Sequence, residues 1–126
     1  MTLEKILLVE DDPDIRTIAE MSLQAVGGFT VKACASGPEA LEAAPAFAPQ
    51  LVLLDVMMPG MDGPAVLAAL RTKPETANVP IVFLTAKVQQ EEIERLKSLG
   101  ARDVLAKPFD PMKLSDEVRA VWARGQ

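Results

Sequence analysis

The sequence predicts an α/β domain in which five parallel strands form one sheet with helices on both faces. Three observations support this fold class. Five short apolar segments alternate with five helical patterns, which is the order of repeated βα units. Most of the apolar segments are continuous rather than alternating, as is typical of parallel strands buried on both faces. The right-handed crossovers between such strands restrict the topology to a few doubly wound forms.

Each expected strand has its own pattern. The first is rich in Ile, Leu and Val, the second alternates like an edge strand, the third and fourth are continuously apolar, and the fifth is short. Pro80 lies at the start of the fourth strand, where a missing amide hydrogen is tolerated. The strands are expected at residues 5–10, 29–34, 51–55, 79–85 and 102–107.

The helical segments carry start and stop signals. Asp12 is a suitable N-cap for the first helix, with Pro13 at its first position, and Gly27-Gly28 ends it. Later helices show similar devices (Ser36 or Gly37 before Pro38, Asp110 before Pro111, and Gly100 as a C′ residue). These helices are expected over residues 36–44, 63–71, 90–100 and 110–123.

Length and composition fit one domain. The chain has 126 residues, of which 49 % are hydrophobic, and this is enough for one complete core. No apolar run approaches the roughly 18 residues that span a bilayer. The first segment, MTLEKILLVEDD, lacks the basic start and the cleavage site of a signal peptide. We therefore expect a single soluble, cytoplasmic domain over residues 1–126, without membrane contact.

Charge and residue counts exclude several functions. The formal net charge of −5 argues against direct nucleic-acid binding, which usually uses a basic face. The chain has no histidine, so it contains no His-based zinc site, no Ser-His-Asp triad and no phosphohistidine of its own. Its only cysteine, Cys34, lies in an apolar stretch and is expected to pack as a small hydrophobic side chain. Chemistry in this chain must therefore use carboxylates, lysine or hydroxyl groups, with or without a metal ion.

Polar residues gather where the expected strands end. The first strand ends in Glu10-Asp11-Asp12, the third in Asp55, the fourth in Thr85 and the fifth in Lys107. The carboxyl ends of parallel strands share one edge of the sheet, and ligands bind beyond this edge near a topological switch point. We expect these side chains to form one site, with Asp12 serving as the helix cap.

The chemistry of this set favours a hard cation. Glu10, Asp11 and Asp55 would repel one another and raise each other's pKa values, and two partners can relieve the repulsion: a divalent cation and the ammonium group of Lys107. Because all the donors are oxygen atoms, Mg²⁺ fits best. A carboxylate nucleophile, a metal, a lysine and a hydroxyl group together suit phosphoryl transfer.

Four segments resemble the signature segments of the receiver domains of two-component response regulators. They are ILLVEDDPDIR, LVLLDVMMPGMDG, PIVFLTA and GARDVLAKPF, and the similarity covers essentially the whole chain. The resemblance implies a flavodoxin-like (βα)5 fold with strand order 2-1-3-4-5. It also implies a function in a phosphorelay.

The resemblance also implies a role for each site residue. Asp55 matches the aspartate that accepts the phosphoryl group, and Glu10 and Asp11 match the acidic pair that holds Mg²⁺. The backbone carbonyl of Met57 would be a further metal ligand.

Two further matches and one departure lie on the last two strands. Thr85 matches the hydroxyl group that binds the phosphoryl group on activation, and Lys107 matches the lysine that pairs with it. The Lys107–Pro108 peptide bond is expected to be cis. Val104 departs from the family, because many receivers carry Tyr or Phe there, and valine cannot report the movement of Thr85 as that ring does.

The expected mechanism is a phosphorylation switch. A sensor histidine kinase or a histidine phosphotransfer protein would supply the phosphoryl group, and the receiver would catalyse only its own phosphorylation and dephosphorylation. Transfer would shift a population of states at the face of the fourth helix, fifth strand and fifth helix. Homodimerisation through this face is compatible with the assignment, although no pattern requires it. The exposed residues expected on the face include Gln90, Glu94, Arg95, Arg102 and Lys113.

Three alternatives are weighed against this function. An aspartyl-nucleophile phosphatase usually needs a second aspartate two residues after the nucleophile, where this chain has Met57. A nucleotide-binding module would need a Gly-rich loop after the first strand, where this chain has three acids. A pseudo-receiver, a pure interaction module, would typically lack Asp55, Lys107 or the acidic pair, and all are present.

Overall fold

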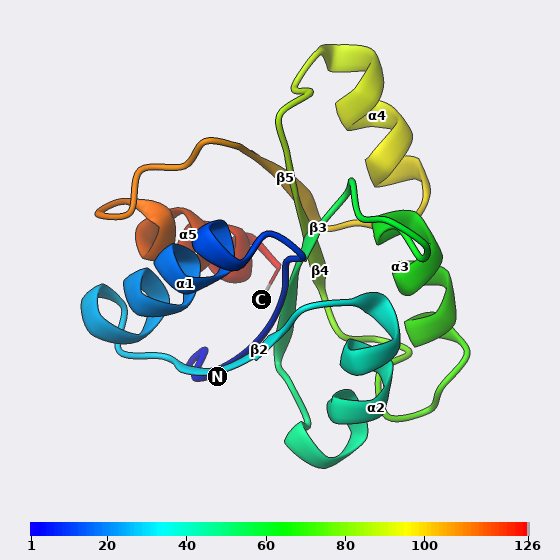
Figure 1. Cartoon of the computed structure of the whole chain (residues 1–126), viewed down its shortest axis with the longest axis horizontal. Helices are drawn as coiled ribbons and strands as arrows, with labels where there is room; N and C mark the ends of the chain where they lie inside the picture. The colour runs from blue at the N-terminus through cyan, green and yellow to red at the C-terminus, as the bar shows by residue number, and fades with distance from the viewer. Residues whose placement is uncertain (126) are drawn as a thin grey trace.

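Five parallel strands form one sheet in the computed structural model, which describes residues 1–125 (Figure 1). Gln126, the last residue of the expected domain, lies outside the described residues. The strand order is β2-β1-β3-β4-β5, which confirms the predicted α/β flavodoxin-like topology. The strands are β1 (Lys5–Val9), β2 (Thr30–Cys34), β3 (Leu51–Asp55), β4 (Ile81–Thr85) and β5 (Asp103–Ala106).

The helices cover both faces of the sheet. In Figure 1, α1 and α5 lie on one side, and α2, α3 and α4 lie on the other. A short π-helical segment, η1 (Ser22–Val26), continues α1. None of the helices in residues 1–125 combines the length and apolar character needed to span a bilayer. The helices are α1 (Pro13–Met21), α2 (Gly37–Phe47), α3 (Gly63–Arg71), α4 (Gln90–Ser98) and α5 (Leu114–Arg124).

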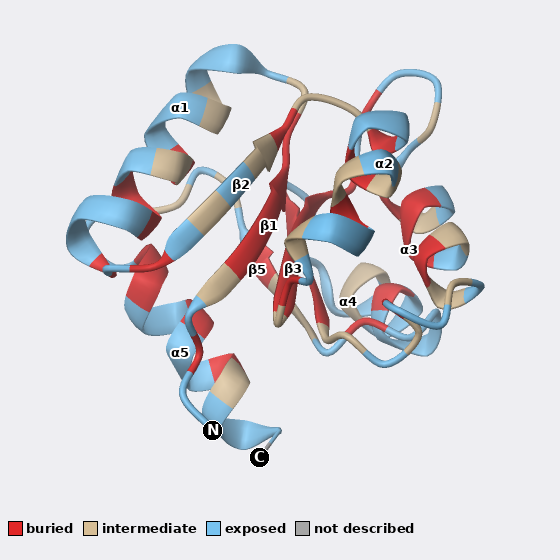
Figure 2. Cartoon of the chain, turned by 90° about the horizontal axis from the view of Figure 1, so that it is seen from below, coloured by how far each residue is buried: buried red, intermediate tan, exposed pale blue. Residues whose placement is uncertain are grey.

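Two apolar cores lie on the two faces of the sheet. Alternate residues of β1 illustrate the division, because Leu7 packs toward α2 and α3 whereas Leu8 packs toward α1 and α5. The three inner strands are almost fully buried, while the edge strand β2 has exposed positions (Figure 2). This explains why the inner strands are continuously apolar and the second strand alternates. Cys34 is completely buried in one core, as predicted.

Several predicted caps are confirmed. The side chain of Asp12 accepts hydrogen bonds from the amides of Asp14 (2.9 Å) and Ile15 (3.1 Å), so it caps α1. Ser36 caps α2 in the same way. Gly100 follows the last turn of α4 with a φ of 116°, a left-handed value that favours glycine.

Two helix boundaries differ from the prediction by three residues or more. The last helix begins at Leu114 rather than beside Asp110, because Asp110 instead organises a turn: its side chain accepts from the Met112 amide and its carbonyl from Lys113. The second helix continues three residues beyond the predicted end and includes Pro45, which is exposed in its last turn.

The segment η1 joins α1 to α5. The buried hydroxyl group of Ser22 donates to the carbonyl of Pro111, in the loop between β5 and α5. Arg119 of α5 donates to the carbonyl of Gly27 and lies 4.4 Å from the centre of the Phe29 ring. These contacts hold the end of α1 and η1 against α5 and the loop before it.

Candidate functional site

The ends of four strands converge at one edge of the sheet. Glu10 directly follows β1, Asp55 ends β3, Thr85 ends β4 and Lys107 directly follows β5. Parallel pairing in register aligns these ends, since Asp55 pairs with Leu84, the residue before Thr85. The predicted grouping of these side chains is therefore what the backbone produces.

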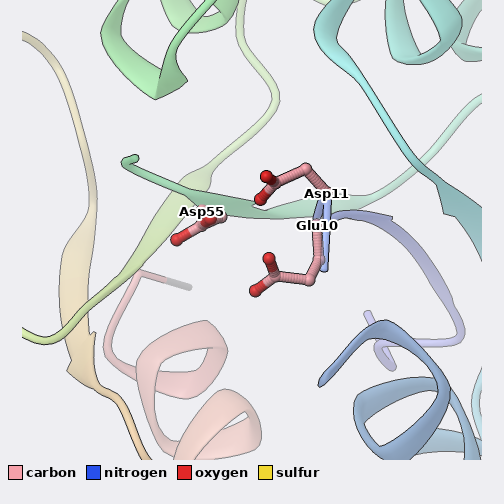
Figure 3. A group of neighbouring side chains, drawn as sticks. All are labelled: Glu10, Asp11 and Asp55. Carbon is pink, nitrogen blue, oxygen red and sulfur yellow. The ribbon is translucent and has the colours of Figure 1, made fainter. Parts of the chain in front are cut away.

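Three carboxylates meet at this edge (Figure 3). Glu10 and Asp11 come from the loop after β1, and Asp55 comes from β3. One oxygen of each lies within 4.8 Å of one oxygen of each of the others. Glu10 and Asp55 are only 1 % and 2 % exposed, whereas Asp11 is half-buried. This arrangement concentrates negative charge in a nearly dry location.

Lys107 links the two buried acids. Its Nζ lies 2.9 Å from Oε1 of Glu10 and 3.0 Å from Oδ1 of Asp55. The second oxygen of Glu10 accepts a hydrogen bond of 3.1 Å from the Asp12 amide. One ammonium group therefore serves two buried carboxyl groups, and Asp11 adds a third acid that it does not contact at salt-bridge distance.

Burial dominates the ionisation of the site. It raises the pKa of Glu10 from 4.5 to about 7, although the hydrogen bonds from Lys107 and from the Asp12 amide act in the opposite direction. Burial likewise raises the pKa of Asp55. For Lys107, burial alone would lower the pKa, but its hydrogen bonds to both carboxylates outweigh this effect and raise it. An additional cation would therefore stabilise the ionised forms of these carboxyl groups.

The donor set fits a hard divalent ion. The three carboxylates offer oxygen atoms only, and the chain has no histidine. Mg²⁺ prefers such ligands, together with water and phosphate oxygens.

Met57 lies two residues beyond Asp55, just after β3, with an exposed side chain. Coordination by its carbonyl stays a prediction.

Thr85 is buried beside this group. Its hydroxyl oxygen accepts a hydrogen bond of 3.1 Å from the Lys87 amide, and its carbonyl accepts one of 2.9 Å from the Lys107 amide. In this structure the hydroxyl group is therefore hydrogen-bonded to the loop between β4 and α4. The Lys107–Pro108 bond is cis, as expected.

An apolar groove lies next to Lys107. Its volume is about 380 Å³, and it separates the start of α1 from the loop between β5 and α5. Ile18 is 47 % exposed and lines this groove. The lining residues are Ile15, Ile18, Ala86, Lys107, Pro108, Phe109 and Pro111.

One residue near the site was not predicted from the sequence. Arg16 donates hydrogen bonds to the backbone carbonyls of Glu10 and Asp11. A signal was available, because an arginine in the second turn of a helix points back toward the helix start, where the acidic loop lies.

Curated relatives match the chain at substantial identity. A probable transcriptional regulator, ycf27, of Guillardia theta is 40 % identical over 123 residues, which is 98 % of this chain and 47 % of the relative. The DNA-binding response regulator MtrA of Mycolicibacterium smegmatis is 38 % identical over 98 % of this chain and 52 % of its own length. The chain therefore spans about half the length of the curated relatives it matches.

A solved structure and a family model agree with these relatives. The chemotaxis protein CheY4 of Vibrio cholerae superposes with a TM-score of 0.87 at 32 % identity, covering 95 % of this chain and 99 % of that one. The family model for the response regulator receiver domain matches residues 6–119. By fold, by sequence and by the acids at its strand ends, this chain belongs to the response regulator receiver domain family.

Proposed function

We propose that this chain accepts a phosphoryl group on Asp55 in a Mg²⁺-dependent reaction and acts as a switch in a two-component phosphorelay. The observation that carries the proposal is the pairing of a nearly dry Asp55 with Lys107 at 3.0 Å, inside a group of three carboxylates. A structural carboxylate needs no further acids beside it. A phosphoacceptor needs a cation on each side of the incoming phosphoryl group.

The proposed roles follow from position. Glu10, Asp11 and Asp55 would hold Mg²⁺, with the carbonyl of Met57 as a further ligand. When bound, Mg²⁺ would neutralise charge on the oxygens of the transferring phosphoryl group. Lys107 would bind one of these oxygens and keep Asp55 ionised against the effect of burial.

The proposed reaction uses Asp55, the phosphohistidine donor and water. An oxygen of Asp55 attacks phosphorus in line with the P–N bond of a phosphohistidine. That bond breaks, the imidazole leaves and takes a proton from solvent, and an acyl phosphate forms on Asp55. Water later attacks phosphorus and releases inorganic phosphate. The protein thus catalyses only its own phosphorylation and dephosphorylation.

The groove beside Lys107 supports a protein donor. The phosphohistidine of a sensor kinase or of a phosphotransfer protein must approach Asp55 closely, and the apolar groove with exposed Ile18 gives such a partner a surface to bury. Its partner would therefore be a histidine-phosphorylated protein, with no direct contact to nucleic acid by this domain. The proposed compartment is the cytoplasm.

Phosphorylation would act through Thr85. Its hydroxyl group accepts from the Lys87 amide, so a phosphoryl oxygen that draws Thr85 toward Asp55 would move the start of this loop with it. The loop leads into α4, and the proposed switch is therefore the face formed by α4, β5 and α5. Val104 lies half-buried on β5 and has no ring to follow this movement.

Intact mass spectrometry tests the proposal. The full chain is incubated with acetyl phosphate and Mg²⁺, and one phosphoryl group is expected on the parent protein. None is expected after Asp55→Asn or in the presence of EDTA. Asp62→Asn is the matched control, because Asp62 is an exposed helix cap and asparagine caps equally well. No phosphoryl gain and no beryllofluoride binding by the parent would leave an interaction module.

A further inference from the structure

Arg16 contacts the backbone of two proposed metal ligands. Its Nη1 donates hydrogen bonds to the carbonyl oxygens of Glu10 (3.0 Å) and Asp11 (3.3 Å). The side chain is half-buried and starts from the second turn of α1, four residues after the cap Asp12. Side chains on a helix lean toward its N-terminus, so the guanidinium reaches back past the helix start to the acidic loop.

The two carbonyl groups lie between regular elements. β1 ends at Val9, and the backbone hydrogen bonds of α1 begin with the bond from the Arg16 amide to the Asp12 carbonyl (2.9 Å). The carbonyls of Glu10 and Asp11 therefore belong neither to the sheet ladder nor to the helix. Rotation of either peptide plane would redirect the carboxylates that the loop carries.

We infer that Arg16 is a positioning residue whose guanidinium fixes this loop so that Glu10 and Asp11 present their carboxylates to a divalent cation. The guanidinium binds backbone carbonyls and leaves the carboxylate oxygens free for the ion. This inference rests on the proposed function and deepens it. It assigns to Arg16 the orientation of the metal site without direct contact with the metal.

A charge effect and a positioning effect of Arg16 predict opposite changes in Mg²⁺ affinity when this residue is replaced. If the guanidinium acted only through its positive charge, its removal would strengthen Mg²⁺ binding, because a positive group that repels the cation would be gone. If it holds the loop, its removal weakens Mg²⁺ binding. Residues that orient metal ligands typically contribute at least about tenfold to affinity, and we expect a loss of about this size.

Arg71 provides a matched control. It also donates from Nη1 to two backbone carbonyls, those of Thr76 (3.2 Å) and Val79 (2.7 Å), and it is also half-buried. It ends α3 and bonds the loop that leads into β4, so it serves the opposite edge of the sheet. Arg71→Gln therefore removes the same charge and a similar set of hydrogen bonds away from the acids.

The experiment is calorimetric titration of the full chain with Mg²⁺ alone, accompanied by urea unfolding. We expect Arg16→Gln and Arg16→Lys to bind Mg²⁺ about tenfold more weakly than the parent, since lysine keeps the charge on a shorter side chain without the guanidinium fork. We expect Arg71→Gln to bind like the parent. Arg16→Lys alone decides the matter if Arg16→Gln does not fold.

Several outcomes would overturn the inference. Equal or tighter Mg²⁺ binding by Arg16→Gln would remove the positioning role, and parental binding by Arg16→Lys would show that the paired guanidinium hydrogen bonds are not what orients the ligands. A comparable loss in Arg71→Gln would assign it to general stability. If the parent itself binds no Mg²⁺, the proposed function fails. If the parent binds Mg²⁺ and accepts phosphate while Arg16→Gln is unchanged, only this inference fails.

Discussion

Lys107 is the only cation within salt-bridge distance of the buried Glu10 and Asp55, among residues 1–125. Its replacement by methionine, which has a similar length, leaves both carboxyl groups without a counter-charge. We expect Lys107→Met to lower the free energy of unfolding by about 3 kcal/mol in metal-free buffer at neutral pH, since breaking a buried pair leaves buried charge without compensation. Because Glu10 can then take up a proton, the loss lies at the low end for such pairs. Urea unfolding measures it.

Mg²⁺ and a second lysine supply the controls for this prediction. Mg²⁺ should recover part of the stability lost in Lys107→Met, since it also balances the carboxylates. Lys97 pairs with Asp103 at 3.6 Å, but its side chain is about half exposed. Lys97→Met should therefore cost less than about 1 kcal/mol. Equal losses for the two variants would show that Lys107 has no special electrostatic role.

The raised pKa of Glu10 predicts how stability depends on pH. Burial moves this pKa from 4.5 to about 7, so between these values the folded protein binds more protons than the unfolded chain. The free energy of unfolding should therefore fall as the pH rises from about 4.5 to about 7 in buffer that contains EDTA. The raised pKa of Asp55 acts in the same direction. Urea unfolding across this range tests the slope, which should flatten in Glu10→Gln.

At the scale of elements, the junction of η1 and α5 leaves no space at Gly27. A Cβ at this position would lie 2.3 Å from Oγ of Ser115 and 2.7 Å from the carbonyl oxygen of Leu23. The φ of Gly27 is −87°, so the cost of a side chain is steric rather than conformational. We expect Gly27→Ala to lower the free energy of unfolding by about 2 to 3 kcal/mol, measured by urea unfolding.

A comparison with Gly28 distinguishes steric crowding from backbone strain. Its φ is 74°, but an added Cβ would meet nothing within 4 Å. Gly28→Ala should therefore cost only about 1 kcal/mol, through its left-handed conformation. Adding Ser115→Ala to Gly27→Ala should recover part of the loss, because it removes the closest atom. Similar losses for the two glycine variants would contradict this account of the junction.

The same junction shows which elements the sequence could predict. The caps Asp12 and Ser36 are local signals, and each was confirmed because a side chain needs only its own helix to form the bond. The π-helical η1 was not predicted, since it bonds Pro111 and Ser115, which are distant in sequence. The start of α5 was placed too early, because Asp110 caps a turn as readily as a helix.

At the scale of the molecule, topology explains why the meeting of these side chains could be predicted. Parallel strands end at one edge, so Glu10, Asp55 and Lys107 had to meet once the strands were identified. The sequence could not show which carboxylate oxygens Lys107 contacts, or which backbone carbonyls accept hydrogen bonds from Arg16. Those facts depend on side-chain directions, which periodicity does not specify.

The last prediction concerns α4, a helix that buries little apolar surface. Leu96 is its only buried residue, and its N-cap, Gln89, makes no side-chain hydrogen bond to the helix. By contrast, α3 buries four residues and is capped by Asp62. Weakly anchored elements are the ones that local opening and switching use. We therefore expect phosphorylation to alter amide hydrogen exchange in residues 86–98 more than in residues 63–71.

Hydrogen exchange monitored by mass spectrometry, with and without beryllofluoride and Mg²⁺, measures this response. Thr85→Ala should still bind beryllofluoride but show a smaller change in residues 86–98, because the loop loses the hydroxyl group that links it to the site. Val104→Ala should respond like the parent, since valine has no ring that follows Thr85. A change spread equally over α3 and α4 would contradict a switch at the α4-β5-α5 face. A large effect of Val104→Ala would show that an aliphatic side chain transmits the movement that an aromatic ring transmits in other receivers.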